Sequence, residues 1–168
     1  EGTLFGTNRD DKEIRRYLLE KCQLQAVVSM PAGVFQPYSG VKTSVLIFKK
    51  KLIPKLDEDE KIWFFNMLGD GSSLSAAKKF GPQYKNDIPK LLELWNKNRV
   101  VEKPYSWFTS VKEIMENDYI LSANTYNPYS GEETTSHREP KEILKEIGKM
   151  DDKLTELKRN LDKKLKDY

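Results

Sequence analysis

Three consecutive apolar residues, Ala26-Val27-Val28, lie at the centre of a segment from Leu24 to Met30 whose composition is typical of a β-strand. Strand side chains alternate between the two faces of a sheet, so an uninterrupted apolar run is expected where both faces are covered. Helices on both faces of a sheet supply that cover. The run therefore favours an α/β fold.

A second strand, rich in β-forming residues, is predicted from Thr43 to Phe48. The connection between the two strands, residues 31–42, has twelve residues that include two glycines and two prolines. A tight hairpin needs about two to five residues, so this loop is long for its place in the chain. Since loops on a rigid scaffold often carry function, we expect part of the functional site here.

Weaker patterns predict the elements around these strands. Asn8 to Asp11 offers N-caps for an amphipathic helix that ends near Lys21. Residues 118–126 are expected to be extended or irregular. The other expected elements are a strand at 62–67, a Gly/Ser-rich turn at 69–75, a helix capped by Asp87 and a short helix opened by the capping-box pattern of Ser110 and Glu113.

From Pro140 onward, Lys, Glu and Asp surround a stripe of apolar residues. The stripe residues are three and four positions apart over roughly three heptads, which predicts one continuous helix over 143–165 with a coiled-coil seam. Because an apolar seam needs a covering surface, the helix either folds back on its own domain or pairs with another chain. The seam is formed by Ile147, Met150, Leu154, Leu157 and Leu161, extended by Ile143 and Leu165.

The overall composition is that of a mildly basic, charged globular protein. A net charge of +3 and a pI near 8.8 fall below the pI of about 9 that free-standing DNA-binding domains usually exceed. The lysine clusters at 49–51 with Lys55, and at 78–79, are interpreted as solvated loop surface. No apolar run is long enough to span a membrane, and the single cysteine, Cys22, fits a cytoplasmic protein. His137 has no partners at ligand spacing, so no metal site is expected.

A series of short motifs follows a fixed order through residues 1–130. The motifs are Leu4-Phe5, Ile14-Arg15, Leu18-Leu19, Met30-Pro31, Phe35, the segment from Val41 to Phe48, and Asn117-Asp118-Tyr119-Ile120-Leu121 with Tyr126. Their order and spacing resemble the C-terminal half of the catalytic domain of N6-adenine DNA methyltransferases, and the helical tail suits the modification subunit of type I restriction-modification systems. In that family a strand ends in Leu-Phe and a later strand runs into Leu-Pro, where Met30 here replaces leucine at similar volume.

The resemblance implies a fold, a domain organisation and an activity. The fold would be the distal half of a Rossmann-like methyltransferase sheet with its antiparallel hairpin, followed by a C-terminal coiled-coil helix. Residues 1–135 would form the C-terminal part of the catalytic domain, and residues 136–168 a helical tail for subunit docking. The parent protein would transfer a methyl group from S-adenosylmethionine to N6 of adenine in double-stranded DNA, in a complex with a specificity subunit and a restriction subunit.

Two motifs of that family are not found in the 168 residues. Gly69-Asp70-Gly71 is too short for the glycine-rich cofactor turn and is not followed directly by a helix pattern. Asn127-Pro128-Tyr129 has only one proline of the catalytic tetrapeptide and is interpreted as a turn. The chain also begins at Glu1 without a methionine. We therefore expect a C-terminal fragment with no catalytic residue and no complete S-adenosylmethionine site, inactive on its own.

The long loop 31–42 carries the candidate site residues. Enzymes that modify a base extrude it from the duplex and hold it by stacking. The resemblance places Phe35 where related enzymes have an aromatic that stacks on the flipped adenine, with Tyr38 shaping the pocket and Lys42 contacting phosphate. The alternatives are that Phe35 packs the loop against the sheet and that Lys42 is an exposed loop lysine. Arg15 either pairs with an acidic residue outside this chain or lies on a solvated helix face.

Three functions remain open at this point. The resemblance favours a part of the modification subunit that supplies one wall of the base pocket and docks the specificity subunit through the seam. The alternative from a different functional class is a non-enzymatic α/β interaction module that dimerises through the same seam. The third is a part of a single-chain restriction-methylation fusion. Without a specificity subunit, the seam is expected to pair with a second copy of the chain.

Overall fold

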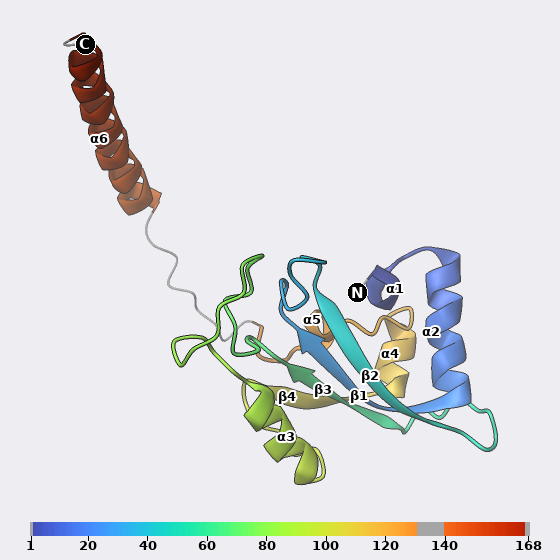
Figure 1. Ribbon diagram of the computed structural model, residues 1–168. Coiled ribbons are helices and arrows are strands. Elements are labelled where there is room, and N and C mark those ends of the chain that lie inside the picture. The colour runs from blue at the N-terminus through green and yellow to red at the C-terminus, as the bar shows by residue number, and fades with distance from the viewer. Residues whose placement is uncertain (1, 131–139, 167–168) are drawn as a thin grey trace. The chain divides into compact units, whose positions relative to one another are not determined.

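The computed structural model describes residues 2–130 and 140–166. The chain separates into two compact units, residues 1–130 and 131–168. The first unit is a mixed sheet with helices, and in the second the described residues form the helix α6, Pro140–Lys166 (Figure 1). His137 lies outside the described residues.

A four-stranded mixed sheet forms the centre of the first unit (Figure 1). Its strands are β1 Cys22–Met30, β2 Thr43–Lys50, β3 Lys61–Asn66 and β4 Ser106–Ser110, in the order β2-β1-β3-β4. β1 pairs antiparallel with β2 across the long loop 31–42 and parallel with β3, and β3 pairs antiparallel with β4. The α/β class and the antiparallel pair are confirmed. The assignment to one half of a Rossmann-like sheet stays a prediction.

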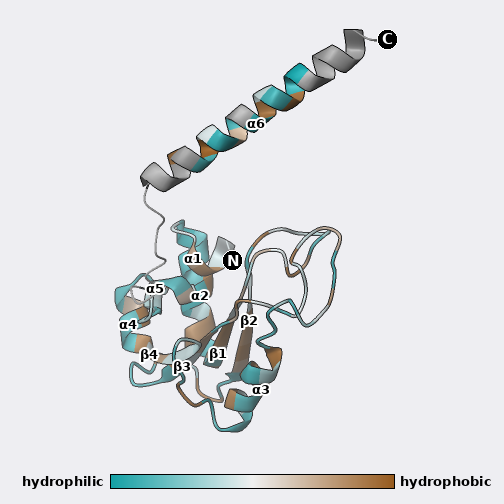
Figure 2. Cartoon of the chain, turned by 90° about the vertical axis from the view of Figure 1, so that its left-hand side faces the viewer, coloured by the Kyte–Doolittle hydropathy of each residue, from teal (hydrophilic) through white to brown (hydrophobic). Residues whose placement is uncertain are grey.

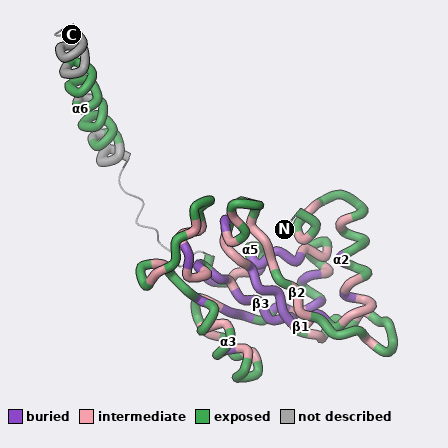
Figure 3. Tube along the Cα trace, viewed as in Figure 1, coloured by how far each residue is buried: buried purple, intermediate pink, exposed green. Residues whose placement is uncertain are grey.

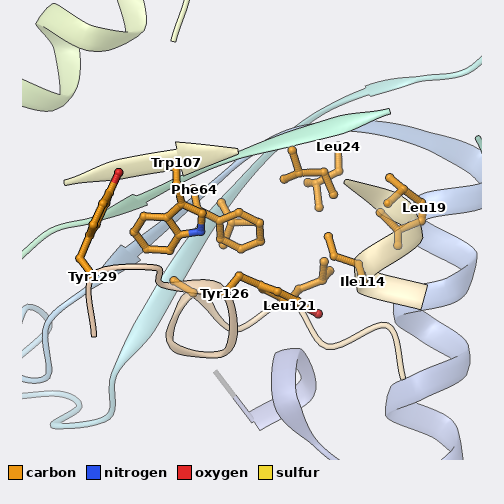
Figure 4. Close-up of a cluster of buried hydrophobic side chains, with 12 residues drawn as sticks. Leu19, Leu24, Phe64, Trp107, Ile114, Leu121, Tyr126 and Tyr129 are labelled. Carbon is orange, nitrogen blue, oxygen red and sulfur yellow. The ribbon is translucent and has the colours of Figure 1, made fainter. Parts of the chain in front are cut away.

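One face of the sheet carries the larger core. It is covered by α2 (Arg9–Lys21), α4 (Val111–Glu116) and the short α5 (Ala123–Tyr126) (Figure 1). At its centre Phe64 stacks on Trp107 of the neighbouring strand, with ring centroids 5.9 Å apart (Figure 4). Such an aromatic pair contributes about 0.5–1.5 kcal/mol beyond its buried area, so this contact anchors β4 to β3.

The opposite face of β1 and β3 packs against α3, Ile88–Asn96. Trp63, which is fully buried, lies on this face because it alternates with Phe64 along β3. The apolar run of β1 is divided in the same way, with Val27 in the first core and its two neighbours in the second. Figure 3 shows β1 and β3 buried along most of their length. Both faces of the central strand are therefore covered, which confirms the expectation from its sequence.

β2 lies at the edge of the described sheet, and only its end, Lys49-Lys50, carries the charges usual in an edge strand. Its stretch Val45-Leu46-Ile47-Phe48 contains no charge and no proline, and Val45 and Phe48 are about half-exposed. Edge strands are usually protected by charged residues, prolines or bulges, because an apolar edge pairs with other strands. The outer edge of β2 is therefore suited to pairing with a further strand.

Two local predictions are wrong, and one strand was not predicted. Leu4-Phe5 does not end a strand but lies in α1, Gly2–Phe5, where the Gly2 carbonyl accepts a helical hydrogen bond from the Gly6 N–H at 2.7 Å. Residues 118–126 are not wholly irregular, because α5 forms one helical turn at their end. Strand β4 was not predicted from the sequence, because its five residues are too few for a clear alternation.

The predicted helix caps are confirmed at two of three positions. Asn8 caps α2 by accepting from the Asp11 N–H at 2.8 Å, and Ser110 caps α4 by accepting from the Glu113 N–H at 3.2 Å. Asp87 precedes α3 as predicted, but its carboxylate does not cap that helix. It accepts instead from the N–H groups of Leu68 and Gly69, at 2.7 and 3.2 Å, so it holds the loop before the helix.

Arg15 occupies neither of the two environments expected for it. Its side chain is almost fully buried, and the guanidinium donates to the backbone carbonyls of Thr3 at 2.6 Å, Tyr119 at 2.9 Å and Asp118 at 3.1 Å. A guanidinium has five donors and no acceptor, which suits a cluster of carbonyl groups. Arg15 thus joins α2 to the chain's N-terminal turn and to the segment after α4.

The second unit confirms the prediction of one continuous helix over residues 143–165. Four of the five seam residues have described side chains, and these are 50–64% exposed in the chain: Ile147, Met150, Leu154 and Leu157. The fifth, Leu161, lies within the helix, but its side chain is outside the described set. Figure 2 shows apolar bands along α6 separated by hydrophilic residues. That another surface covers the seam, as in a coiled coil, stays a prediction.

Candidate functional site

The loop 31–42 follows β1 at the carboxyl end of that strand and is folded into successive turns. The Gly33 carbonyl accepts from the Gln36 N–H at 3.1 Å, and the Phe35 carbonyl accepts from the N–H groups of Tyr38 and Ser39 at 2.9 and 3.0 Å. These bonds fix the backbone on both sides of Phe35. The loop therefore has a defined conformation.

The three candidate residues of this loop are placed differently. The Phe35 side chain is 49% exposed, and that of Tyr38 is 95% exposed. Neither is buried in a core cluster, so packing of Phe35 wholly against the sheet is not observed. Lys42 is half-buried, and its ammonium donates to Asn124 Oδ1 of α5 at 3.0 Å. Lys42 therefore braces the end of the loop against a neighbouring helix, and it is not a simple exposed lysine.

A second loop, residues 67–87, lies beside the first at the same end of the sheet (Figure 1). The Lys78 ammonium donates to the backbone carbonyl of Val34 and forms an ion pair with Asp70 at 3.1 Å. Gly33 lies against the Leu74 carbonyl, which would be 2.3 Å from a Cβ atom at that position. The two loops are therefore in direct contact through both a side chain and their backbones.

The interpretation of the two lysine runs as solvated loop surface is wrong in part, because Lys49 and Lys50 end strand β2 and one lysine in each run is largely buried. Lys51 pairs with Glu60 at 3.0 Å and donates to the Leu19 carbonyl at 3.1 Å, with only 11% of its side chain exposed. Lys78 is the corresponding exception in the other run, whereas its neighbour Lys79 is exposed as expected. The partners of both lysines include backbone carbonyls, which leave no residue-specific signal in a sequence.

The charge of Asp70 is stabilised within the second loop. Burial on its own raises the pKa of this carboxyl, but hydrogen bonds from Ser72 and from the Lys78 ammonium outweigh burial, so the pKa lies below its ordinary value. The carboxylate accepts from the Ser72 hydroxyl at 2.6 Å and from the Ser72 N–H at 3.0 Å. Asp70 is therefore an ionised anchor for Lys78 at neutral pH.

The turn Gly69-Asp70-Gly71 does not fit a nucleotide-type cofactor. A Cβ atom at Gly69 would lie 2.1 Å from the Lys85 carbonyl, and Gly71 faces the Asn86 side chain. The open side that a cofactor phosphate or carboxylate would need is thus filled by residues 85–86. That the described residues lack a complete S-adenosylmethionine site stays a prediction, which the packing of this turn favours.

An apolar cavity of about 400 Å³ lies on the α3 face of the sheet, behind the loop 31–42. It is lined by Val28, Met30, Val34, Val45, Ile47, Met67, Asp70, Ile88, Leu91, Leu92 and Trp95.

In the ranges 2–130 and 140–166, no group of three or more metal-ligating side chains is found, and no helix has the length and apolar content to cross a membrane. The turn at Asn127-Pro128-Tyr129 is confirmed, since Asn127 Oδ1 accepts from the Tyr129 N–H at 2.9 Å.

The fold and the loop arrangement can be compared with known proteins. The family model described as N-6 DNA Methylase matches residues 1–136. The chain belongs to the N-6 DNA methylase family. Membership confirms the resemblance that the ordered motifs indicated. The matched residues include the sheet and both loops.

Curated members of this family have similar sequences. The chain is 30% identical to the type I restriction enzyme EcoEI methylase subunit of Escherichia coli, over 96% of this chain and 32% of that protein. It is 30% identical to the MpnII methylase subunit of Mycoplasma pneumoniae, over 95% of this chain and 27% of that protein. The chain thus spans about a third or less of the length of these relatives.

Solved structures of the family agree with the fold. A chain from a study of complex assembly and conformational transition of the type I R-M system matches all of this chain and 34% of its own length, with a TM-score of 0.53 and 27% identity. The type I methyltransferase subunit of Streptococcus thermophilus matches 72% of this chain and 23% of its own length, with a TM-score of 0.50 and 26% identity. The mixed sheet is therefore similar to part of these structures.

Proposed function

We propose that this chain is the C-terminal part of a type I modification subunit that methylates N6 of adenine in double-stranded DNA. Within that protein, the chain supplies one wall of the pocket for the flipped base. The cofactor, the methyl-transferring groups and the remaining walls would come from the rest of the parent protein. The proposal rests on family membership and on the placement of Phe35.

Phe35 is the observation that carries the base-pocket role. An aromatic ring that stacks on an extruded base must have a free face and a fixed backbone. Phe35 meets both conditions, because its side chain is half-exposed while its carbonyl is held by two N–H donors. Tyr38, three residues further on and almost fully exposed, is proposed to shape the edge of the same pocket.

Lys42 is proposed to contact a DNA phosphate from the end of the loop. Its ammonium is a cationic donor that the hydrogen bond to Asn124 holds at the end of the loop, and such a group suits a phosphate oxygen. Phosphate contacts of this kind orient a protein on the duplex without reading its sequence. Lys42 would then fix the loop relative to the DNA backbone while Phe35 contacts the base.

The helix α6 is proposed to dock the specificity subunit through its apolar seam. The four described seam side chains are each half-exposed or more, and covering each one would contribute roughly 1.5–3 kcal/mol. The restriction subunit is the further partner expected of such a complex. The apolar outer edge of β2 is in turn suited to a strand from the rest of the parent sheet.

The proposal is tested by assembling the full-length subunit with its specificity subunit and measuring N6-methyladenine in substrate DNA. Phe35→Ala should lower the methylation rate about five- to a hundredfold, since base–aromatic stacking contributes roughly 1–3 kcal/mol. Phe5→Ala, which removes a side chain of similar exposure from α1, is the matched control and should leave the rate unchanged. Equal rates for Phe35→Ala and the control would exclude the base-pocket role.

The two other functions considered from the sequence are less well supported. Family membership favours a methyltransferase over a non-enzymatic adaptor that dimerises through the seam. The similar proteins are methylase subunits of type I restriction enzymes, which favours a modification subunit over a single-chain fusion.

A further inference from the structure

The loop 67–87 contacts the loop 31–42 at Val34, the residue immediately before Phe35. Lys78 reaches from the loop 67–87 to the carbonyl of Val34, the residue before Phe35. Its ammonium also pairs with Asp70, so the donor cannot turn away without breaking an ion pair. Both side chains are largely shielded from water, with 23% of Lys78 and 11% of Asp70 exposed.

A backbone contact reinforces this connection. Gly33 has a φ of +91°, a conformation that favours glycine, and its Cα faces the Leu74 carbonyl. Any side chain at this position would overlap that carbonyl, since a Cβ atom would be only 2.3 Å away. The close approach fixes the first loop relative to the second on the other side of Val34.

The second loop is itself held in place, so it can serve as a support. Asp87 accepts from the N–H groups at its start, and isolated bridges join Asp70 to Asn86 and Ser72 to Phe80. These contacts close the loop at its base and across its middle. The loop is therefore anchored independently of its contact with residues 33 and 34.

We propose that Lys78 is a positioning residue for Phe35: it fixes the Val34 carbonyl and thereby the direction in which the Phe35 ring meets the flipped base. The inference rests on the proposed base-pocket role of Phe35. Groups that contact a reacting base need to be placed within about 0.5 Å of the productive geometry. A misplacement of about 1 Å can cost a hundredfold in rate, which makes a single support point consequential.

Lys79 provides the matched comparison. It has the same charge as Lys78 and is adjacent in sequence, but it is exposed. A role of the lysine run in attracting DNA by charge would make the two positions equivalent. A positioning role makes only Lys78 important, because only its ammonium reaches the Val34 carbonyl.

The test compares Lys78→Met with Lys79→Met in the full-length subunit assembled with its specificity subunit. Methionine keeps the length of the side chain and removes the ammonium. Lys78→Met should speed hydrogen exchange of the amides of residues 33–39 and lower kcat by the same order as Phe35→Ala, with KM for DNA nearly unchanged. Lys79→Met should change neither exchange nor kcat, and Lys78→Arg, which keeps the charge and donors, should restore most of the activity.

The outcomes separate this inference from the proposed function. If Phe35→Ala lowers methylation but Lys78→Met leaves both exchange and kcat unchanged, the positioning role is wrong and the base-pocket role stands. Equal losses in Lys78→Met and Lys79→Met would replace positioning with a general charge effect. If Phe35→Ala itself has no effect on methylation, the proposed base-pocket role is wrong. Hydrogen exchange of the amides of residues 33–39 in Lys78→Met then still shows whether Lys78 holds the loop.

Discussion

The Arg15 guanidinium donates to the carbonyl of Tyr119 at 2.9 Å, across 104 positions of the chain. Asp118 and Tyr119 both have positive φ values, 54° and 59°, which direct consecutive carbonyls toward the same guanidinium. Non-glycine residues in this region cost of order 1–3 kcal/mol each and persist where their surroundings determine them. Arg15 is the buried group that stabilises this turn.

Replacing Arg15 with methionine should therefore destabilise the first unit. The change leaves three carbonyls without their donor, and the expected loss in free energy of unfolding is about 2–4 kcal/mol. Urea unfolding of the 168-residue chain, followed by tryptophan fluorescence, measures it. Arg16→Met, at the exposed neighbour, should stay within about 0.5 kcal/mol of the original chain. Equal losses for the two variants would contradict the role assigned to Arg15.

The depressed pKa of Asp70 predicts a pH dependence of stability. A carboxyl whose folded-state pKa is lowered contributes stability that is fully present above its ordinary pKa of 3.8 and is lost as the pH falls through the folded value. Asp70→Asn should reduce the free energy of unfolding at pH 7 and make it less sensitive to acidification below pH 4. Asp59→Asn, at an exposed carboxylate, is the control. Identical pH profiles for Asp70→Asn and the original chain would exclude the Asp70–Lys78 anchor.

Periodicity and caps made much of the fold predictable. The apolar run of β1, the strand β2, and the caps at Asn8 and Ser110 are local patterns, and the structure has them where they were expected. The seam of α6 is likewise a local repeat that predicts its helix. Phe35 is a candidate because it follows a strand and a proline in a motif order shared with a family, and its role stays a prediction.

The contacts of Arg15 and Lys78 could not be predicted in the same way. Their acceptors are backbone carbonyls, which every residue has, at separations of 104 and 44 positions. Tertiary structure alone brings donor and acceptor together. The short strand β4 could not be predicted for a related reason. Trp107 belongs to a strand mainly because it pairs with Phe64 of β3, which is a tertiary contact.

The seam of α6 predicts assembly through Leu154 and Leu157. Replacing both with aspartate places two charges on the apolar stripe, so the full-length subunit should no longer bind its specificity subunit, and the 168-residue chain should lose any self-association. Size-exclusion chromatography with light scattering measures both effects. Thr155→Asp with Lys158→Asp, exposed positions beside the seam, is the control and should assemble normally. Normal assembly of the Leu154/Leu157 variant would refute the docking role.

The chain on its own should not bind S-adenosylmethionine, because residues 85–86 pack against both glycines of the turn Gly69-Asp70-Gly71. Calorimetry with the 168-residue chain should detect no binding tighter than about 1 mM, or roughly 4 kcal/mol. The full-length subunit, measured in parallel, should bind the cofactor. Equal affinity of the chain and the full-length subunit would place the cofactor site within this chain.

The most direct test of the base-pocket role is fluorescence of 2-aminopurine placed at the target adenine in duplex DNA. Extrusion of this base from the stack raises its fluorescence, and stacking on an aromatic side chain quenches it. The assembled full-length protein carrying Phe35→Ala should therefore give brighter emission from the extruded base than the original protein, while Phe5→Ala should match the original. Identical emission from all three proteins, at equal DNA occupancy, would contradict the proposal that Phe35 contacts the flipped base.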